Sequence, residues 1–158
     1  MTTKLRCFIL ALSLLPGAAL AAGDTSSAGP VYQKDPVLER VSAATARQDW
    51  TRAQAILKDA LQKSPDNADY NNMYAYTIRK GPNPDMSLVF QYYNKALAID
   101  PKHLGAHEYL GEAYLQVGNL AKAKEELAAL DKLCLFSCNE YTMLKKAVAD
   151  YETRQAQR

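Results

Sequence analysis

The stretch LGAHEYLGEAYLQVGNLAKAKEELAALDK, residues 104–132, determines how the rest of the chain can fold. Apolar residues recur in it at helical spacing, and Gly118-Asn119 interrupts the pattern before it resumes. This spacing predicts two helices joined by a tight turn. Inside a helix Gly111 costs about 1 kcal/mol relative to alanine, which is reasonable only where a second helix approaches closely. Because neither helix can bury its apolar stripe alone, we interpret the stretch as a hairpin that stacks on neighbouring units.

A more specific pattern is carried by Leu110, Gly111, Tyr114, Ala123, Leu127 and Leu130. Their spacing resembles the tetratricopeptide repeat, whose period is about 34 residues. Upstream, the segments DALQKSP and KALAIDP share one phase and end in Pro65 and Pro101. The prolines are two residues further apart than the family period, and the turn at residues 80–85 is where we place that excess.

The resemblance implies three repeats, at residues 35–67, 68–103 and 104–136, in an all-α right-handed superhelical stack. It also implies a non-catalytic protein that binds other proteins and uses no cofactor. The 158 residues suffice for one such domain.

Residues 1–21 have the layout of a cleaved secretory signal. Lys4 and Arg6 precede an apolar run at residues 7–15, and small residues follow up to an expected cleavage site after Ala21 or Ala22. The run is shorter than the roughly 20 residues that span a bilayer, which argues against an uncleaved anchor. We therefore expect a soluble bacterial protein in the periplasm or secreted, without stable membrane insertion, in which residues 22–34 form a flexible linker.

The charge balance argues against a nucleic-acid partner. The chain has 19 Lys and Arg against 17 Asp and Glu, and removal of Lys4 and Arg6 with the signal leaves 17 against 17. A surface that tracks phosphates needs a clustered basic excess. We expect a protein or peptide partner instead.

Helix starts can be placed from capping residues. Asp35 before Pro36 predicts the first helix, and Asp49 predicts the second. Trp50 then follows the turn, and we expect it to pack in the hairpin corner, with a role in binding as the alternative. In the second repeat, the resemblance places Tyr74, Ala75 and Ile78 inside the hairpin, with Phe90 and Tyr93 facing them.

The helix that carries Tyr74 and Ile78 has a polar opposite side, formed by Asp69, Asn72, Tyr76 and Arg79. The resemblance assigns these positions, with Glu108 and Glu112 in the third repeat, to the concave groove where the family binds its partners. Asn and Arg side chains can hydrogen-bond a peptide backbone, and a Tyr supplies contact area. One alternative is an ordinary solvated helix face. Another mode of binding is self-association through the convex face.

After signal removal, Cys134 and Cys138 are the remaining cysteines. Ser137 and Glu140 fit a capping box, which predicts a helix at about 138–155 that covers the open end of the stack. In an oxidising compartment the two cysteines should form a disulfide. A redox pair is the alternative, because a helix N-terminus favours the thiolate of Cys138.

The two histidines also allow two interpretations. His103 and His107 are four residues apart and, with Cys134 and Cys138, could form a metal site in an exported thiol or metal-binding accessory protein. We favour a structural role instead, in which His103 caps a helix and His107 is packed and hydrogen-bonded. Glu125 and Glu126 are predicted to belong to a solvated face.

Overall fold

The computed structural model describes residues 34–136 and 138–157, which form seven helices and contain no strand. The helices are α1 (Pro36–Thr45), α2 (Trp50–Lys63), α3 (Ala68–Lys80), α4 (Met86–Ile99), α5 (Leu104–Gln116), α6 (Leu120–Leu133) and α7 (Asn139–Ala156). The predicted all-α stack is therefore confirmed. The predicted signal and almost all of the linker lie outside the described residues.

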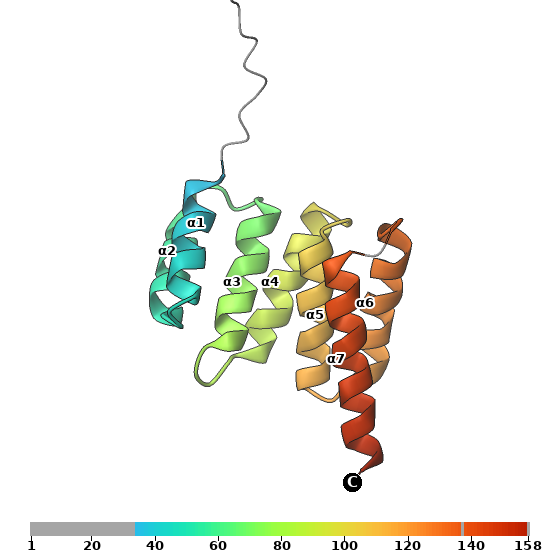
Figure 1. The fold of residues 1–158 in the computed structure, drawn as a ribbon. Helices are drawn as coiled ribbons and strands as arrows, with labels where there is room; N and C mark the ends of the chain where they lie inside the picture. Colours follow the sequence, from blue (N-terminus) through green and yellow to red (C-terminus); the bar gives the residue numbers. More distant parts are fainter. Residues whose placement is uncertain (1–33, 137, 158) are drawn as a thin grey trace, which may run out of the picture. The chain divides into compact units, whose positions relative to one another are not determined.

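The helices pack as three antiparallel pairs followed by a single helix (Figure 1). α1 pairs with α2, α3 with α4, and α5 with α6, so that each predicted repeat contains one pair. α7 then packs against α5 and α6. No helix in the described part of the chain is long and apolar enough to cross a bilayer.

The core repeats with the sequence. Ala53, Val89 and Ala123 occupy the same phase of the three repeats, and all three are fully buried. Each of the first six helices is preceded by a residue whose side chain accepts a hydrogen bond from a backbone amide of the first turn. Asp35 accepts from the Val37 amide at 2.7 Å and from the Tyr70 hydroxyl at 2.7 Å, so the predicted cap also ties α1 to α3.

Gly111 lies where α5 meets α7. A Cβ atom on Gly111 would be 2.5 Å from Cδ2 of Leu144, and Leu144 is fully buried. The predicted close approach at this glycine is confirmed, and the helix that approaches is α7.

The aromatic residues of α4 contact both neighbouring helices. Phe90 and Tyr93 belong to the core cluster that contains Ala75 and Ile78 of α3. The ring of Phe90 also stacks on that of Tyr114 of α5, with centroids 4.9 Å apart. Tyr92 packs edge-on against Tyr74, with ring centroids 4.7 Å apart.

The predicted disulfide between Cys134 and Cys138 forms at the α6–α7 connection, with Cα atoms 5.7 Å apart. Ser137, the predicted helix cap, lies outside the described residues. The residue that precedes α7 is Cys138, and its side chain makes no capping hydrogen bond. The start of α7 is thus held by the disulfide.

Candidate functional site

The six predicted groove residues lie on two neighbouring helices, with Asp69, Asn72, Tyr76 and Arg79 on α3 and Glu108 and Glu112 on α5. They are not an ordinary solvated face. Asn72, Arg79 and Glu108 are only 4%, 8% and 7% exposed. Polar side chains that are this buried need partners, so the hydrogen bonding of each one shows what the site can do.

Arg79 is the centre of a buried ion pair. Its Nη2 lies 2.6 Å from Oε2 of Glu112, and its Nε donates to the Tyr93 hydroxyl at 3.3 Å. Its guanidinium also lies 5.8 Å from the ring centre of Tyr76 and 6.0 Å from that of Tyr109. Burial raises the pKa of Tyr93, so that hydroxyl keeps its proton. The charge of Arg79 is therefore neutralised within the fold.

Aromatic rings run beside this pair from one repeat to the next. Tyr76 packs against Tyr109 of α5 at 4.9 Å between ring centres, and Trp50 of α2 meets Tyr76 edge-on at 6.3 Å. All three are half-buried. From its sequence position, Trp50 was expected in a hairpin corner. Tyr109 was not among the predicted groove residues, although the position of Tyr109 next to Glu108 was a signal for it.

A hollow of about 310 Å³ adjoins the ion pair. Arg79 and Glu112 form one side of it, and Leu115 of α5 and Tyr151 of α7 contribute to the rest. The groove therefore continues toward α7 with space for part of a ligand.

Glu108 differs from Glu112 because it has no partner. Among the described residues, no side chain or backbone donor bonds to its carboxylate. Burial, together with the nearby carboxylates of Glu112 and Glu140, raises the pKa of Glu108 to about 7, and Arg79 offsets only part of this rise.

Asn72 is a second buried acceptor, and its Oδ1 has no hydrogen-bond partner. Its Nδ2 faces Gly105, where an added Cβ would be 3.4 Å away. Gly105 lies three residues before Glu108, so both are on one face of α5.

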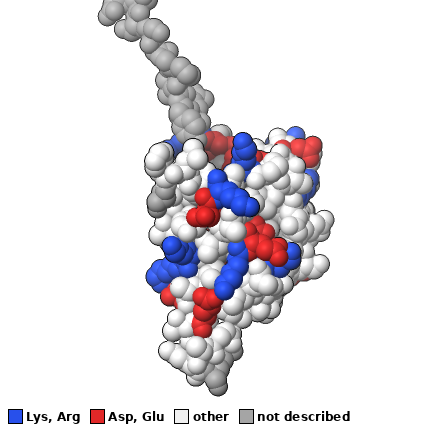
Figure 2. Space-filling model, turned by 90° about the vertical axis from the view of Figure 1, so that its right-hand side faces the viewer, with Lys and Arg blue, Asp and Glu red and all other residues white. Residues whose placement is uncertain are grey.

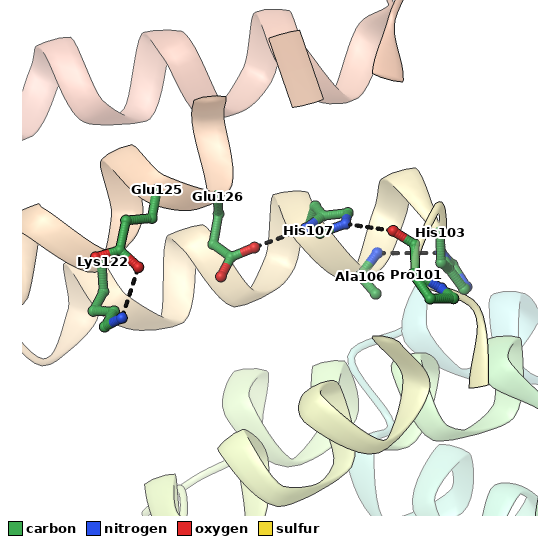
Figure 3. Close-up of polar contacts among 7 residues, drawn as sticks. All are labelled: Pro101, His103, Ala106, His107, Lys122, Glu125 and Glu126. Carbon is green, nitrogen blue, oxygen red and sulfur yellow. Dashed lines mark hydrogen bonds and ion pairs between the residues drawn. The ribbon is translucent and has the colours of Figure 1, made fainter. Parts of the chain in front are cut away.

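His103 joins the helix starts of α3 and α5. Its Nδ1 accepts from the Ala106 amide at 3.2 Å, so the predicted cap is confirmed (Figure 3). Because Nδ1 accepts, a neutral ring carries its proton on Nε2. This nitrogen lies 3.1 Å from Oδ1 of Asp69, but it makes no hydrogen bond with Asp69 or with another described residue.

His107 is the predicted packed histidine. Its Nδ1 lies 2.7 Å from Oε2 of Glu126 and its Nε2 lies 3.1 Å from the carbonyl oxygen of Pro101 (Figure 3). Both partners are acceptors, so the arrangement favours the imidazolium form, in which both nitrogens donate. The hydrogen bond to Glu126 is the main reason why the pKa of His107 is raised.

The expectation that Glu125 and Glu126 are both solvated is wrong for Glu126. Its side chain is 15% exposed, because this position on α6 faces α5 and His107. Glu125 is 61% exposed and pairs with Lys122 at 2.6 Å.

The alternative thiol or metal site is not assembled. His103 and His107 contact carboxylates of different helices, and the two cysteines are bonded to each other. In residues 34–136 and 138–157 no group of three or more His, Cys, Asp or Glu has an arrangement that could hold a metal ion.

The surface charge differs from that of the groove. Figure 2 views the side of the molecule that lies to the right in Figure 1, and there basic and acidic side chains are interspersed. Pairs such as Lys124 with Glu152 and Lys146 with Asp150 hold α6 and α7 together or stabilise α7. Unpaired carboxylate charge is found instead at Glu108.

Known proteins resemble this chain in sequence and in fold. The sequence profile of the tetratricopeptide repeat matches residues 89–133. The mouse protein WD and tetratricopeptide repeats protein 1 is 33% identical over 101 residues, which make up 61% of this chain and 15% of the mouse protein. The chain thus spans a small part of that relative's length.

Solved structures extend the likeness to most of the chain. The TPR2B domain of yeast Sti1, solved as a pHsp70 complex, superimposes with a TM-score of 0.66 at 17% identity, over 75% of this chain and 94% of that one. PcrH in complex with the chaperone binding region of PopD gives a TM-score of 0.60 at 17% identity, over 82% and 98%. At this identity the likeness shows the fold. The resemblance to the tetratricopeptide repeat is therefore confirmed.

Proposed function

Because the chain folds as a stack of tetratricopeptide repeats, we propose that it is a non-catalytic protein-interaction module whose groove on α3 and α5 binds a peptide segment or helix of another protein. The observation that carries the proposal is that the Glu108 carboxylate has no donor among the described residues and lies near the half-buried rings of Tyr76 and Tyr109. A buried polar group without a partner is costly in a fold, and a ligand that donates hydrogen bonds removes that cost.

The solved structures support a peptide ligand by analogy of fold. The yeast Sti1 domain is seen in a complex with pHsp70, and PcrH with a region of PopD. In this chain Tyr76 and Tyr109 provide rigid contact area in the corresponding kind of groove, and aromatic residues of this type often dominate binding energy.

We also propose that the protein works in an exported compartment, the periplasm or the exterior of a bacterium. The signal-like pattern of residues 1–21 and the bond between Cys134 and Cys138 support this location, since disulfides persist where the environment is oxidising. Mass spectrometry of protein recovered by osmotic shock tests it. A chain that starts near Gly23 and has no free thiol is expected, and an intact chain found with cytosolic proteins would contradict it.

Site-specific photo-crosslinking tests the groove directly. We would replace Tyr76 with p-benzoylphenylalanine in cells that make the protein, and use Asn94, an exposed residue of α4, as the matched control position. Crosslinks to a partner from position 76 and not from position 94 are expected. The same partner captured only from position 94 would reject the groove, and crosslinks between two copies from position 94 would favour self-association through the other face.

Binding strength is then measured with the captured partner. Asp69→Lys and Tyr76→Ala are suitable variants because both side chains reach solvent. Arg79→Ala is less suitable, because it leaves the half-buried Glu112 without its cation and changes stability as well as binding.

A further inference from the structure

We propose that the groove holds a positively charged side chain, a lysine or arginine of the bound protein segment, with the Glu108 carboxylate as its acceptor. This inference rests on the proposed function and adds the chemistry of the partner. Two observations support it: a groove carboxylate lacks a hydrogen-bond donor, and the charges around that carboxylate are mostly negative.

The Glu108 carboxylate is an acceptor without a donor. Glu108 is 7% exposed, and no donor within the described residues reaches its carboxylate. Asn72 Oδ1, on α3, also receives no donor from the described residues, but it is closed to solvent, so Glu108 is the acceptor that a ligand can reach. The component that Glu108 lacks is an N–H donor.

The surrounding charge selects a cationic donor over a neutral one. Glu112 and Glu140 both lie close enough to Glu108 to disfavour its ionised form, and the cation near them is Arg79. Arg79 is already paired with Glu112 at 2.6 Å and donates to Tyr93. One additional positive charge would balance Glu108, whereas an anionic ligand would add to an excess of carboxylates.

Aromatic rings suit the same ligand. Tyr76 of α3 and Tyr109 of α5 pack together with their ring centres 4.9 Å apart, and Glu108 lies near Tyr109. The faces of tyrosine rings attract ammonium and guanidinium groups, and they also cover the aliphatic stem of a lysine.

Small probes test the inference without knowledge of the partner. Nα-acetyl-lysine N-methylamide is titrated into the purified protein at pH 8, and NMR follows the Glu108 side-chain carboxyl carbon. A saturable shift of this signal is expected. The norleucine analogue, which has the stem without the charge, should leave it in place, and so should the glutamate analogue.

The lysine probe should also change the titration of Glu108. The groups that face this carboxyl are Glu112 and Tyr109 on α5, Arg79 on α3 and Glu140 on α7. A bound cation favours the ionised form, so the midpoint, which lies at about pH 7 in the free protein, should fall in the presence of the probe. A group with a merely structural role would titrate in the same way with and without it.

Matched variants complete the test. Glu108→Gln should bind the lysine probe about tenfold more weakly, because a hydrogen bond to a charged group contributes roughly that factor. Glu125→Gln makes the same charge change on an exposed part of α6 and should bind as the parent does. Circular dichroism shows that both variants are folded.

Equal binding by Glu108→Gln and the parent, tighter binding of the glutamate analogue, or no saturable response to the lysine probe would overturn the inference. Its failure can be distinguished from failure of the proposed function. Crosslinking from position 76 to a partner, combined with a silent lysine probe, would reject the cation while retaining the groove.

Discussion

His107 and Glu108 are adjacent in sequence and lie on different sides of α5. Both are largely buried, with the His107 side chain 12% exposed and Glu108 7% exposed. His107 bonds through both ring nitrogens, to Glu126 of α6 and to the Pro101 carbonyl. Glu108 has no donor among the described residues and faces the carboxylates of Glu112 and Glu140.

His107 and Glu108 show two uses of a buried ionisable group. His107, on the α6 side, finds its hydrogen-bond partners within the fold and links two helices of one hairpin. Glu108, on the groove side, has no donor among the described residues, so its ionised form lowers stability. A fold tolerates such a cost where function requires it. Substitutions of His107 and of Glu108 should therefore have effects of opposite sign on stability.

The largest effect is expected inside the groove, where a charge is paired. Arg79→Met removes the cation and leaves Glu112 and the Tyr93 hydroxyl without a partner. Loss of one member of a buried pair should lower the free energy of unfolding by about 3 kcal/mol, measured by urea denaturation. Adding Glu112→Gln should recover part of that loss. A change below about 0.5 kcal/mol would mean that the pair is effectively solvated.

The next effect tests whether α7 keeps Glu108 buried. The bond between Cys134 and Cys138 closes a loop with a sequence separation of 4 and fixes the start of α7. Replacing both cysteines with serine should lower the free energy of unfolding by about 2 kcal/mol by chain-entropy arithmetic.

If the start of α7 then loosens, Glu140 moves away and the groove admits water. The pKa of Glu108 should fall from about 7 toward its ordinary value, as measured by NMR titration. The His107 side, held by α6, should titrate as before. A change at His107 alone would contradict the division between the two faces.

Much of the fold could be predicted from the sequence because it follows from periodicity and caps. The spacing around Gly111 indicated a second helix close by, and Leu144 of α7 fills that place. Asp35 and His103 were recognised as caps because both precede an apolar helical pattern. These features depend on residues that are near in sequence or repeat at a fixed period.

The partners of individual side chains could not be predicted in the same way. Glu126 was expected in solvent but pairs with His107, and the stack of Phe90 on Tyr114 was not foreseen. Both contacts depend on the rotation of one helix against another. A shift of one residue turns a side chain by about 100°. The raised pKa of Glu108 likewise depends in part on Glu140 of α7, which a single-repeat pattern does not contain.

The third effect concerns the satisfied side. His107→Gln should lower the free energy of unfolding by about 1–2 kcal/mol at pH 6, because hydrogen bonds from an imidazolium are lost. The folded pKa of His107 lies above its ordinary value of 6.5, so its stabilisation is complete below that pH and is lost as pH rises through the folded pKa. Chemical denaturation at pH 6 and pH 9 should therefore show a larger deficit at pH 6.

Glu126→Gln should reproduce this pH dependence, and Glu125→Gln, which alters an exposed pair, should not. A deficit for His107→Gln that is independent of pH would indicate that packing, and not the charged hydrogen bonds, holds the ring.

The smallest effect has the opposite sign and tests the unsatisfied side. Glu108→Gln removes a carboxylate whose pKa is raised from 4.5 to about 7. A raised carboxyl pKa means that the folded protein binds the proton more tightly, so ionisation costs stability as pH rises from 4.5 to about 7. The variant should be more stable than the parent by about 1 kcal/mol at pH 8 and nearly equal to it at pH 4.5.

Chemical denaturation of parent and Glu108→Gln at the two pH values measures this difference, with Glu125→Gln as the control for loss of one exposed charge. If Glu108→Gln were instead less stable than the parent at pH 8, the carboxylate would be forming a stabilising interaction within the fold. The contrast with His107 would then disappear, and with it the reason to expect a cation from a partner at this position.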